Sequence, residues 1–341
     1  MVKKNSEEIQ VFTQSRMADY MTCPRLEWYR YQAGDGCGVK VAQTESFFLE
    51  GEMGHYALQH WYKNWKTGGL MLRKNLIKRV NDKIDEQGEI TPEQYQSLQA
   101  KLSAVIGACH AYKAHYKPDL TKWKFKTIEG KFEVEICGVL WRGRVDLGVE
   151  EEDENGNKSL GFIEHKFLTQ FNVDDYNVLP ISLQQLIYSK GFESLMKQLP
   201  QWYRWNVIKK SSLRRKGMTK KKDGSMPIPE PLIEYETRVQ DQYTKEPEKM
   251  LIRTPPRLVD PKALDMVEQS LGYYLDSHTE MANSKELPPM CFASCTGRYG
   301  KACSFAPACI AYMAGKKQGW NAPECRGLYR AKEVQHEELE D

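Results

Sequence analysis

Two carboxylates and a lysine near the middle of the chain have the types and spacing to bind a divalent cation. Asp146 lies in the run WRGRVDLGVE, residues 141–150, and Glu164 and Lys166 lie in LGFIEHKF, residues 160–167. Because strand side chains alternate between two faces, Glu164 and Lys166 should share one face. The acidic, turn-forming residues EEDENGNKS between the runs predict a hairpin. Antiparallel pairing would then bring Asp146 close to the other two side chains.

The chemistry expected of such a cluster follows from its charges. Two carboxylates a strand spacing apart repel each other and resist ionisation unless a cation lies between them. Magnesium suits this position because it prefers oxygen ligands and keeps water molecules for a reaction. The lysine could then orient or deprotonate an attacking water and help to neutralise a phosphate. The alternative is a surface hairpin with ordinary charges, because Glu-x-Lys occurs in many strands by chance.

Length, charge and cysteine content limit the class of protein. The 341 residues allow one elaborated domain or two, and the formal net charge of only +3 means that any basic surface is local. No apolar run reaches the ~18 residues of a membrane span, and the start MVKKNSEEIQ lacks the apolar region of a signal peptide. The nine cysteines are therefore expected as reduced thiols of a cytoplasmic protein without a membrane partner.

Helices are expected before the hairpin. Residues 12–34 have an amphipathic pattern that a proline interrupts directly after Cys23. Residues 45–65 form a second helical pattern, in which the glycines of GEMGH would let another backbone or a ligand approach His55. A lone histidine on a mixed face is more often structural than a ligand, so both roles remain open for His55.

A helix after the hairpin would contribute two further polar side chains. If it begins near Ser182, Gln184 and Tyr188 are four residues apart and lie on one face. This amide and phenol could brace a DNA phosphate or a metal-bound water, or they could simply lie at a helix–sheet margin. Elsewhere the pattern predicts helices over 70–116 with a break near 87–92, strands over 127–136, 201–210 and 231–240, and a helix over 261–280.

A basic run follows the strand expected over 201–210. Residues 209–224 contain eight lysines and arginines and no apolar periodicity. Such a run is either a solvated loop or an electrostatic clamp on a polyanion. Its place favours the second interpretation, because the run leaves the same sheet that would carry the metal.

Cysteines gather near the C-terminal end of the sequence. Cys291, Cys295, Cys303 and Cys309 could hold zinc or an iron–sulfur cluster. Cys291 and Cys295 fit the short spacing of a zinc-binding pair, whereas Cys303 and Cys309 do not. An iron–sulfur cluster tolerates the longer loops, because its irons are spread over a cube.

Taken together, these motifs resemble the RecB/AddB-type branch of the PD-(D/E)XK nucleases, and within it the phage exonuclease-like members with a four-iron four-sulfur cluster. The resemblance spans nearly the whole chain, in the order of the family's motifs. It is carried by TCPR at Cys23, GEMGH at His55, GRVDLG at Asp146, IEHK at Glu164 to Lys166, QQLIY from Gln184 to Tyr188, WNVIKKSSLRRK, and C-x7-C-x5-C from Cys295 to Cys309.

The resemblance implies a fold and a set of roles. The fold would be α/β, with a restriction-endonuclease-like mixed β-sheet flanked by helices, a helical N-terminal region and a C-terminal cysteine cluster loop. Two departures stand out, because Phe167 occupies a position where threonine is frequent and Cys291 and Cys325 are additional thiols. By resemblance, His55, Asp146 and Glu164 would bind Mg²⁺ or Mn²⁺, Lys166 would be the catalytic lysine, Gln184 and Tyr188 the accessory motif, and Cys23, Cys295, Cys303 and Cys309 the ligands of a [4Fe-4S] cluster.

The sequence therefore predicts a metal-dependent DNA nuclease, an exonuclease of recombination, repair or phage DNA processing. Its substrate would be DNA ends or single-stranded DNA, and a recombinase, helicase or single-strand-binding protein would be its partner. Two alternatives remain open, a nucleic-acid-binding protein with a degenerate active site and a zinc-stapled adaptor protein. The expected organisation is a helical region over 1–125, a nuclease core over 126–260 with the basic loop 209–224, and a cluster region over 261–341, all in one integrated unit.

Overall fold

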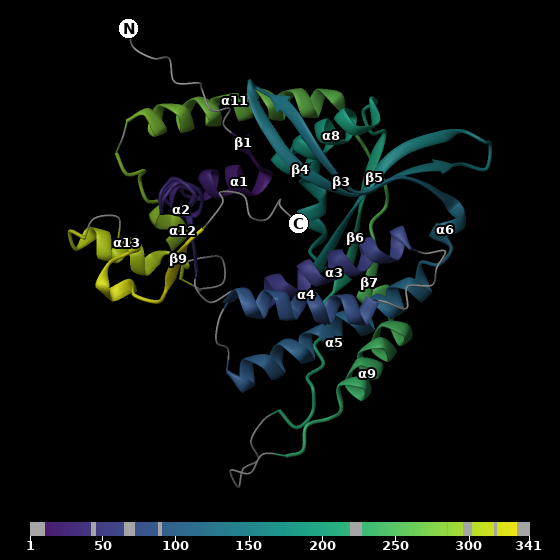
Figure 1. The fold of residues 1–341 in the computed structure, drawn as a ribbon. Helices are drawn as coiled ribbons and strands as arrows, with labels where there is room; N and C mark the ends of the chain where they lie inside the picture. The colour runs from purple at the N-terminus through teal and green to yellow at the C-terminus, as the bar shows by residue number, and fades with distance from the viewer. Residues whose placement is uncertain are drawn as a thin grey trace.

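A mixed β-sheet lies at the centre of the computed structural model (Figure 1). The structure describes residues 11–41, 46–64, 72–87, 91–218, 227–284, 286–295, 302–316 and 319–332. The sheet order is β1-β4-β5-β6-β7, with β3 also paired to β4 and β8 to β6. Its strands are β1 Val11–Phe12, β3 Trp123–Ile136, β4 Val139–Glu152, β5 Lys158–Leu168, β6 Trp202–Lys209, β7 Leu251–Arg253 and β8 Arg257–Leu258.

Helices cover both faces of the sheet. Side chains of α1 (Gln14–Thr22), α8 (Leu183–Met196) and α11 (Pro261–Asn283) pack with the strands in one buried cluster. Those of α3 (Ser46–Lys63), α5 (Pro92–His115) and α9 (Leu232–Lys245) form the other cluster. Figure 1 shows the two groups on opposite sides of the strands, which confirms the expected mixed α/β fold. The remaining α-helices are α2 Pro24–Tyr31, α4 Leu72–Gln87, α6 Asp119–Lys122, α7 Val173–Asn177, α10 Pro247–Met250, α12 Phe292–Cys295 and α13 Ala306–Met313.

The predicted hairpin is formed by β4 and β5. These strands pair antiparallel from Glu152↔Lys158 to Leu147↔Ile163. Asp153 closes the turn, since its Oδ1 accepts hydrogen bonds from the backbone N–H groups of Asn155 and Asn157 at 2.9 and 2.8 Å. β5 then pairs with β6 in parallel, so the carboxyl ends of these two strands lie at the same edge of the sheet.

One secondary-structure prediction is wrong. Residues 231–240 were expected as a strand, but most of them belong to α9, which continues to Lys245. Tyr235, Val239 and Tyr243 are four residues apart and all are buried in the second cluster. This helical spacing, rather than the β propensity of the individual residues, decides the structure of the segment.

A third cluster joins the start of the chain to its later part. Tyr29 of α2 stacks on Phe305 at 5.1 Å, and Phe305 stacks on Tyr329 at 5.2 Å. The short strands β2 (Val39–Val41) and β9 (Tyr329–Ala331) pair antiparallel beside it. Segments about 300 residues apart in sequence are thus packed together. Among the described helices, none has both the length and the apolarity needed to cross a bilayer.

Candidate active site

Asp146 lies where β4 and β5 begin to separate. Backbone pairing ends at Leu147↔Ile163, and the N–H of His165 then donates a 2.7 Å hydrogen bond to Oδ2 of Asp146. The carboxylate thus takes the place of the next backbone acceptor in the ladder. Because both strands are anchored in the sheet, the buried side chain of Asp146 has a fixed position beside β5.

Glu164, Lys166 and Gln184 form a hydrogen-bonded group next to it. Oε1 of Glu164 accepts hydrogen bonds from Nζ of Lys166 at 2.8 Å and from Nε2 of Gln184 at 2.9 Å. Lys166 also lies over the ring of Trp205, 5.4 Å from its centroid. Within the described part of the chain, the buried Oε2 of Glu164 has no hydrogen-bond partner. One oxygen of this carboxylate is therefore oriented by the protein, and the other remains available for a ligand.

A third carboxylate, Glu129, completes the acidic group. Nδ1 of His55, from α3, lies 3.4 Å from Oδ1 of Asp146 and 3.9 Å from Oε1 of Glu129. One ligand atom from each of these three residues falls within 4.8 Å of the other two, the grouping expected of side chains that share a metal ion. His55 and Asp146 were predicted as metal ligands, and their convergence depends on α3 lying against β5. Glu129 was not singled out.

Glu129 escaped sequence analysis because its backbone breaks the pattern of the strand. It lies on β3 between Ile128, which pairs with Leu147, and Gly130, which pairs with Val145. This register places it opposite Asp146. Its φ of 52° is left-handed, which is uncommon for a residue other than glycine. The only signal in the sequence was an acidic residue on the strand before GRVDLG, and the position looked like one more polar residue of an alternating strand.

The pKa values show how these charges oppose one another. Burial and the charge of Asp146 raise the pKa of Glu129 to about 7. Burial and Asp146 also raise the pKa of Glu164, although the ammonium of Lys166 opposes them. Burial alone would lower the pKa of His55, but the carboxylates of Asp146 and Glu129 raise it to about 9. A divalent cation among the carboxylates would remove this mutual repulsion, so the donor set fits a hard metal ion.

Tyr188 lies one helical turn after Gln184 on α8. Its ring is 6.0 Å from that of Phe132. Burial raises its pKa well above the usual value, and the charges of Glu164 and Asp146 add to this effect. The phenol is thus neutral and within electrostatic reach of the carboxylates, on the same helix face as the amide that contacts Glu164.

A buried polar chain lies beneath the acidic group, on the side of α5. Nε2 of His165 is 3.3 Å from the hydroxyl of Tyr112, which accepts a 2.7 Å hydrogen bond from Nδ2 of Asn206. Oδ1 of Asn206 accepts a 2.8 Å hydrogen bond from Nε of Arg253, and Arg253 forms a two-point ion pair with Asp119. This buried polar chain fixes the imidazole ring of His165, whose backbone N–H binds Asp146. It was not predicted, because its members come from distant elements without a common motif.

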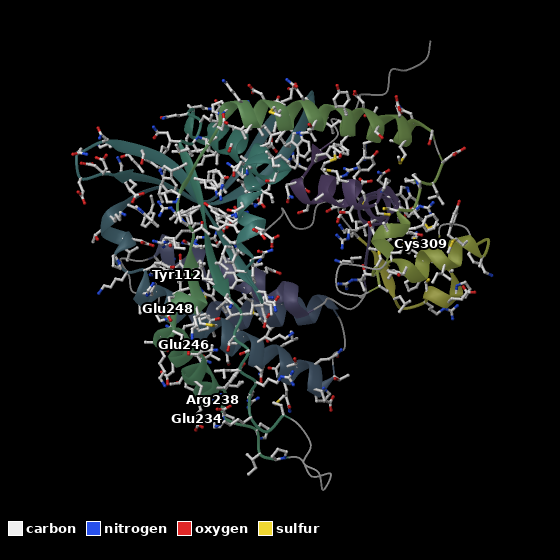
Figure 2. All side chains as sticks on the ribbon, turned by 180° about the vertical axis from the view of Figure 1, so that it is seen from behind. Tyr112, Glu234, Arg238, Glu246, Glu248 and Cys309 are labelled. Carbon is white, nitrogen blue, oxygen red and sulfur yellow. The ribbon has the colours of Figure 1, made fainter. Side chains whose placement is uncertain are left out.

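Five cysteines surround a separate cavity. Cys23 lies in extended backbone between α1 and α2, and its Sγ accepts a hydrogen bond from the N–H of Cys291 at 3.3 Å. The N–H of Cys303 donates to the carbonyl of Cys295 at 2.8 Å. Figure 2 shows Cys309 far from Tyr112 and the sheet. The cavity is lined by Cys23, Cys291, Cys295, Cys303 and Cys309.

The cavity brings together the four cysteines expected as ligands, and Cys291 with them. Burial and the neighbouring Cys303 raise the pKa of Cys309 to about 11, although Arg25 opposes them. The other cysteine noted in sequence analysis, Cys325, is buried in the third cluster and does not line the cavity. The choice between Cys291 and Cys295 therefore remains open on geometry.

A comparison with models of protein families identifies the superfamily of the chain. The family model described as the PD-(D/E)XK nuclease superfamily matches residues 11–310, which include the acidic group and all five cavity cysteines. The chain belongs to this superfamily. A search of curated proteins gave no match. Membership makes the chain a metal-dependent nuclease, and the group of His55, Glu129 and Asp146 is where its described residues offer clustered metal-ligating atoms.

Proposed function

We propose that this PD-(D/E)XK nuclease is a magnesium- or manganese-dependent deoxyribonuclease that degrades DNA from its ends. The observation that carries the proposal is the convergence of His55, Glu129 and Asp146 beside the Glu164–Lys166 pair. The order of motifs along the chain, which resembles the RecB/AddB-type exonucleases, supports action at ends. Recombination, repair or phage DNA processing would be its setting, with a helicase, recombinase or single-strand-binding protein as partner.

His55, Asp146 and Glu164, together with Glu129, would hold the metal ion. A bound divalent cation supplies Lewis acidity toward the phosphate oxygens. The protein's own contribution is to place charges around the reacting phosphate. Nζ of Lys166, which donates a hydrogen bond to Glu164, would orient the attacking water and stabilise negative charge in the transition state. Gln184 holds the same oxygen of Glu164 and so limits its rotation.

The basic segment after β6 supports a polyanionic substrate. Arg214 and Lys216 are exposed, at the end of the sheet where β5 and β6 terminate. The run is described as far as residue 218, and its last lysines lie outside the described residues. Phosphate contacts from such a segment would contribute affinity that falls as salt concentration rises.

We also infer that Cys23, Cys295, Cys303 and Cys309 hold a structural [4Fe-4S] cluster. All four line the cysteine cavity. Zinc sites favour pairs of ligands at short spacing, such as C-x2–4-C. The long loops that separate Cys295, Cys303 and Cys309 in the sequence favour a cluster over a single zinc ion.

End-labelled DNA tests the nuclease proposal. Purified protein with Mg²⁺ should release labelled nucleotides from linear DNA, should leave circular DNA intact, and should be inactive in EDTA. Asp146→Asn should remove this activity, because the substitution keeps the shape of the side chain but removes its charge. Cleavage of circular DNA would reject action at ends. Equal rates for wild type and Asp146→Asn would reject the site and favour an accidental arrangement of charges.

Metal analysis after anaerobic purification tests the cluster. The protein should be brown and carry about four irons per chain, as a cubane requires. Cys291→Ala and Cys295→Ala should differ, and we expect only Cys295→Ala to lose iron because the spacing from Cys295 to Cys303 fits the related motif. Stoichiometric zinc without iron would reject the cluster and support the zinc-stapled alternative.

A further inference from the structure

A cavity of about 360 Å³ lies beside the candidate active site, on the α5 side of the sheet. Its walls come from α3, α5, α9 and the segment that follows β6. Ala100, Ala104 and Ala108 form a wall of small side chains on α5, and Phe167 and Tyr235 face the space as aromatic walls. The interior is therefore apolar and aromatic, and it has room for a flat ring.

Phe167 joins the cavity to the catalytic centre. It is the residue after Lys166 on β5, and its ring lies 5.9 Å from that of His55. A Cβ on Gly54 would come within 2.2 Å of the ring of Phe167, so this glycine allows α3 to lie against it. One side of α3 thus contacts the acidic group and the same helix borders the cavity through Glu50. The cavity and the acidic group are therefore neighbours along α3.

Cationic side chains surround the apolar interior. Lys101, Lys210, Arg214 and Arg215 line the cavity, against the single carboxylate of Glu50. Glu50 pairs with Lys210 at 3.0 Å, so the described lining residues keep an excess of positive charge. An aromatic space bordered by cations matches a planar base attached to a phosphate backbone better than it matches an apolar ligand or a second protein.

We propose that this cavity receives one unstacked base of single-stranded DNA bound across the catalytic centre. The proposal rests on the proposed deoxyribonuclease function and adds a binding site for one base of a single-stranded substrate. Phe167 and Tyr235 stack on or pack against the base, and the cationic side chains bind the adjoining phosphates. A base within a duplex is paired and stacked, so it cannot enter without unpairing. The enzyme therefore acts on strands that are already single, such as overhangs or the product of a helicase.

The test measures DNA binding when one base is removed, when the cavity is filled, and when both changes are made together. Affinity for a short oligothymidylate is measured in EDTA, where no metal-dependent cleavage occurs, with one abasic residue moved stepwise along the strand. In wild type, one position should weaken binding by about 5- to 150-fold, the range of base–aromatic stacking. Ala104→Trp, which fills the cavity, should weaken the binding of intact DNA to a similar extent. In this variant, an abasic residue at the same position should cause no further loss of affinity.

Ala114→Trp is the matched control. Ala114 is exposed on the same helix and does not line the cavity, so this variant should keep both the affinity and the abasic sensitivity of wild type. A second measurement needs no substitution. A 2-aminopurine at the sensitive position of wild-type-bound DNA should be protected from acrylamide quenching, whereas the same probe at distant positions should not.

The outcomes separate this proposal from the function on which it rests. A flat abasic scan, or equal abasic penalties in wild type and Ala104→Trp, together with intact Mg²⁺-dependent cleavage, would overturn the base site alone. Position-specific binding without any cleavage would support the base site and overturn the nuclease activity. Failure of the wild-type protein to bind single-stranded DNA would overturn the base site, and cleavage of duplex ends in the same preparation would leave the nuclease proposal standing.

Discussion

The candidate active site and the cysteine cavity differ in what holds their side chains in place. Asp146 and Glu164 lie on neighbouring strands of one sheet, and α3 and α8 add His55 and Gln184. The cavity, by contrast, uses the junction between α1 and α2 and the short elements α12 and α13. One site is built on a sheet packed on both faces, and the other on the ends of short helices and the turns between them.

This difference predicts that loss of the bound metal or cluster has different consequences at the two sites. In the candidate active site, the protein itself orients the carboxylates, through the N–H of His165 and the donors of Lys166 and Gln184. In the cysteine cavity, the thiols of Cys23 and Cys295 form hydrogen bonds with the backbone of Cys291. Sulfur is a weak hydrogen-bond partner, so these contacts add little stability. Loss of metal should therefore impair chemistry at the first site and folding at the second.

The largest effect is expected for Lys166→Ala. Removing the ammonium should lower the cleavage rate by a factor on the order of 10³, about 4 kcal/mol, because the other donor to Oε1 of Glu164, the amide of Gln184, carries no charge. Thermal stability should change little, since the sheet remains intact. Single-turnover cleavage and a thermal melt measure the two effects. Lys124→Ala, on the exposed side of β3, is the control and should cleave as wild type does.

Cys23→Ser should show the reverse pattern. A cluster that joins Cys23 to Cys303 closes a loop of most of the chain, and such a crosslink can contribute several kcal/mol. Ligand loss should therefore bleach the protein and lower its melting temperature by many degrees, while the molecules that stay folded keep much of their cleavage rate. Cys137→Ser, in the exposed β3–β4 turn, should do neither. A bleached Cys23→Ser protein with wild-type stability would show that the cluster has no structural role.

Sequence analysis predicted those parts of the active site that local periodicity determines. The hairpin and the common face of Glu164 and Lys166 follow from alternation along a strand, and Gln184 and Tyr188 follow from the helical repeat. Glu129 could not be found in this way, because a register shift after Phe125 and a left-handed backbone set its position. These are tertiary features that carry no regular pattern in the sequence.

Sequence analysis missed the helix α9 and the buried polar chain for related reasons. Aromatic and β-branched residues favoured a strand over 231–240, but packing of Tyr235 and Val239 against α5 favours a helix. Tyr112 and Asn206 are 94 residues apart and meet only because α5 covers β6. No local motif marks residues whose common role arises from the packing of a helix on a sheet.

An effect of intermediate size on metal affinity is expected for Glu129→Gln. The substitution removes one charge from the group of ligand atoms within 4.8 Å, but it keeps an oxygen donor and leaves Lys166 in place. The Mg²⁺ concentration needed for half-maximal cleavage should rise about 10-fold or more, as for other changes around a metal site. Binding of Mn²⁺, followed by electron paramagnetic resonance, should weaken by the same factor. Glu133→Gln, exposed on the same strand and paired with Arg142, should leave both values unchanged.

The smallest expected effect tests whether the buried polar chain positions Asp146, a proposed metal ligand, or only stabilises the fold. Tyr112→Phe removes the hydroxyl that accepts from Asn206 and contacts His165, so the amide of Asn206 loses a buried partner at a cost of about 1–3 kcal/mol. Tyr62→Phe is the matched control, because it removes a hydroxyl that contacts Tyr112 at 2.9 Å but keeps the ring that lies 5.8 Å from that of His165. Both variants should lose stability in a denaturant melt. If the buried polar chain orients His165, it also orients Asp146, which the backbone N–H of His165 binds. In that case only Tyr112→Phe should also weaken Mn²⁺ binding, by several-fold. Equal Mn²⁺ affinity in the two variants would limit the chain to a structural role and would leave the sheet alone as the element that positions Asp146.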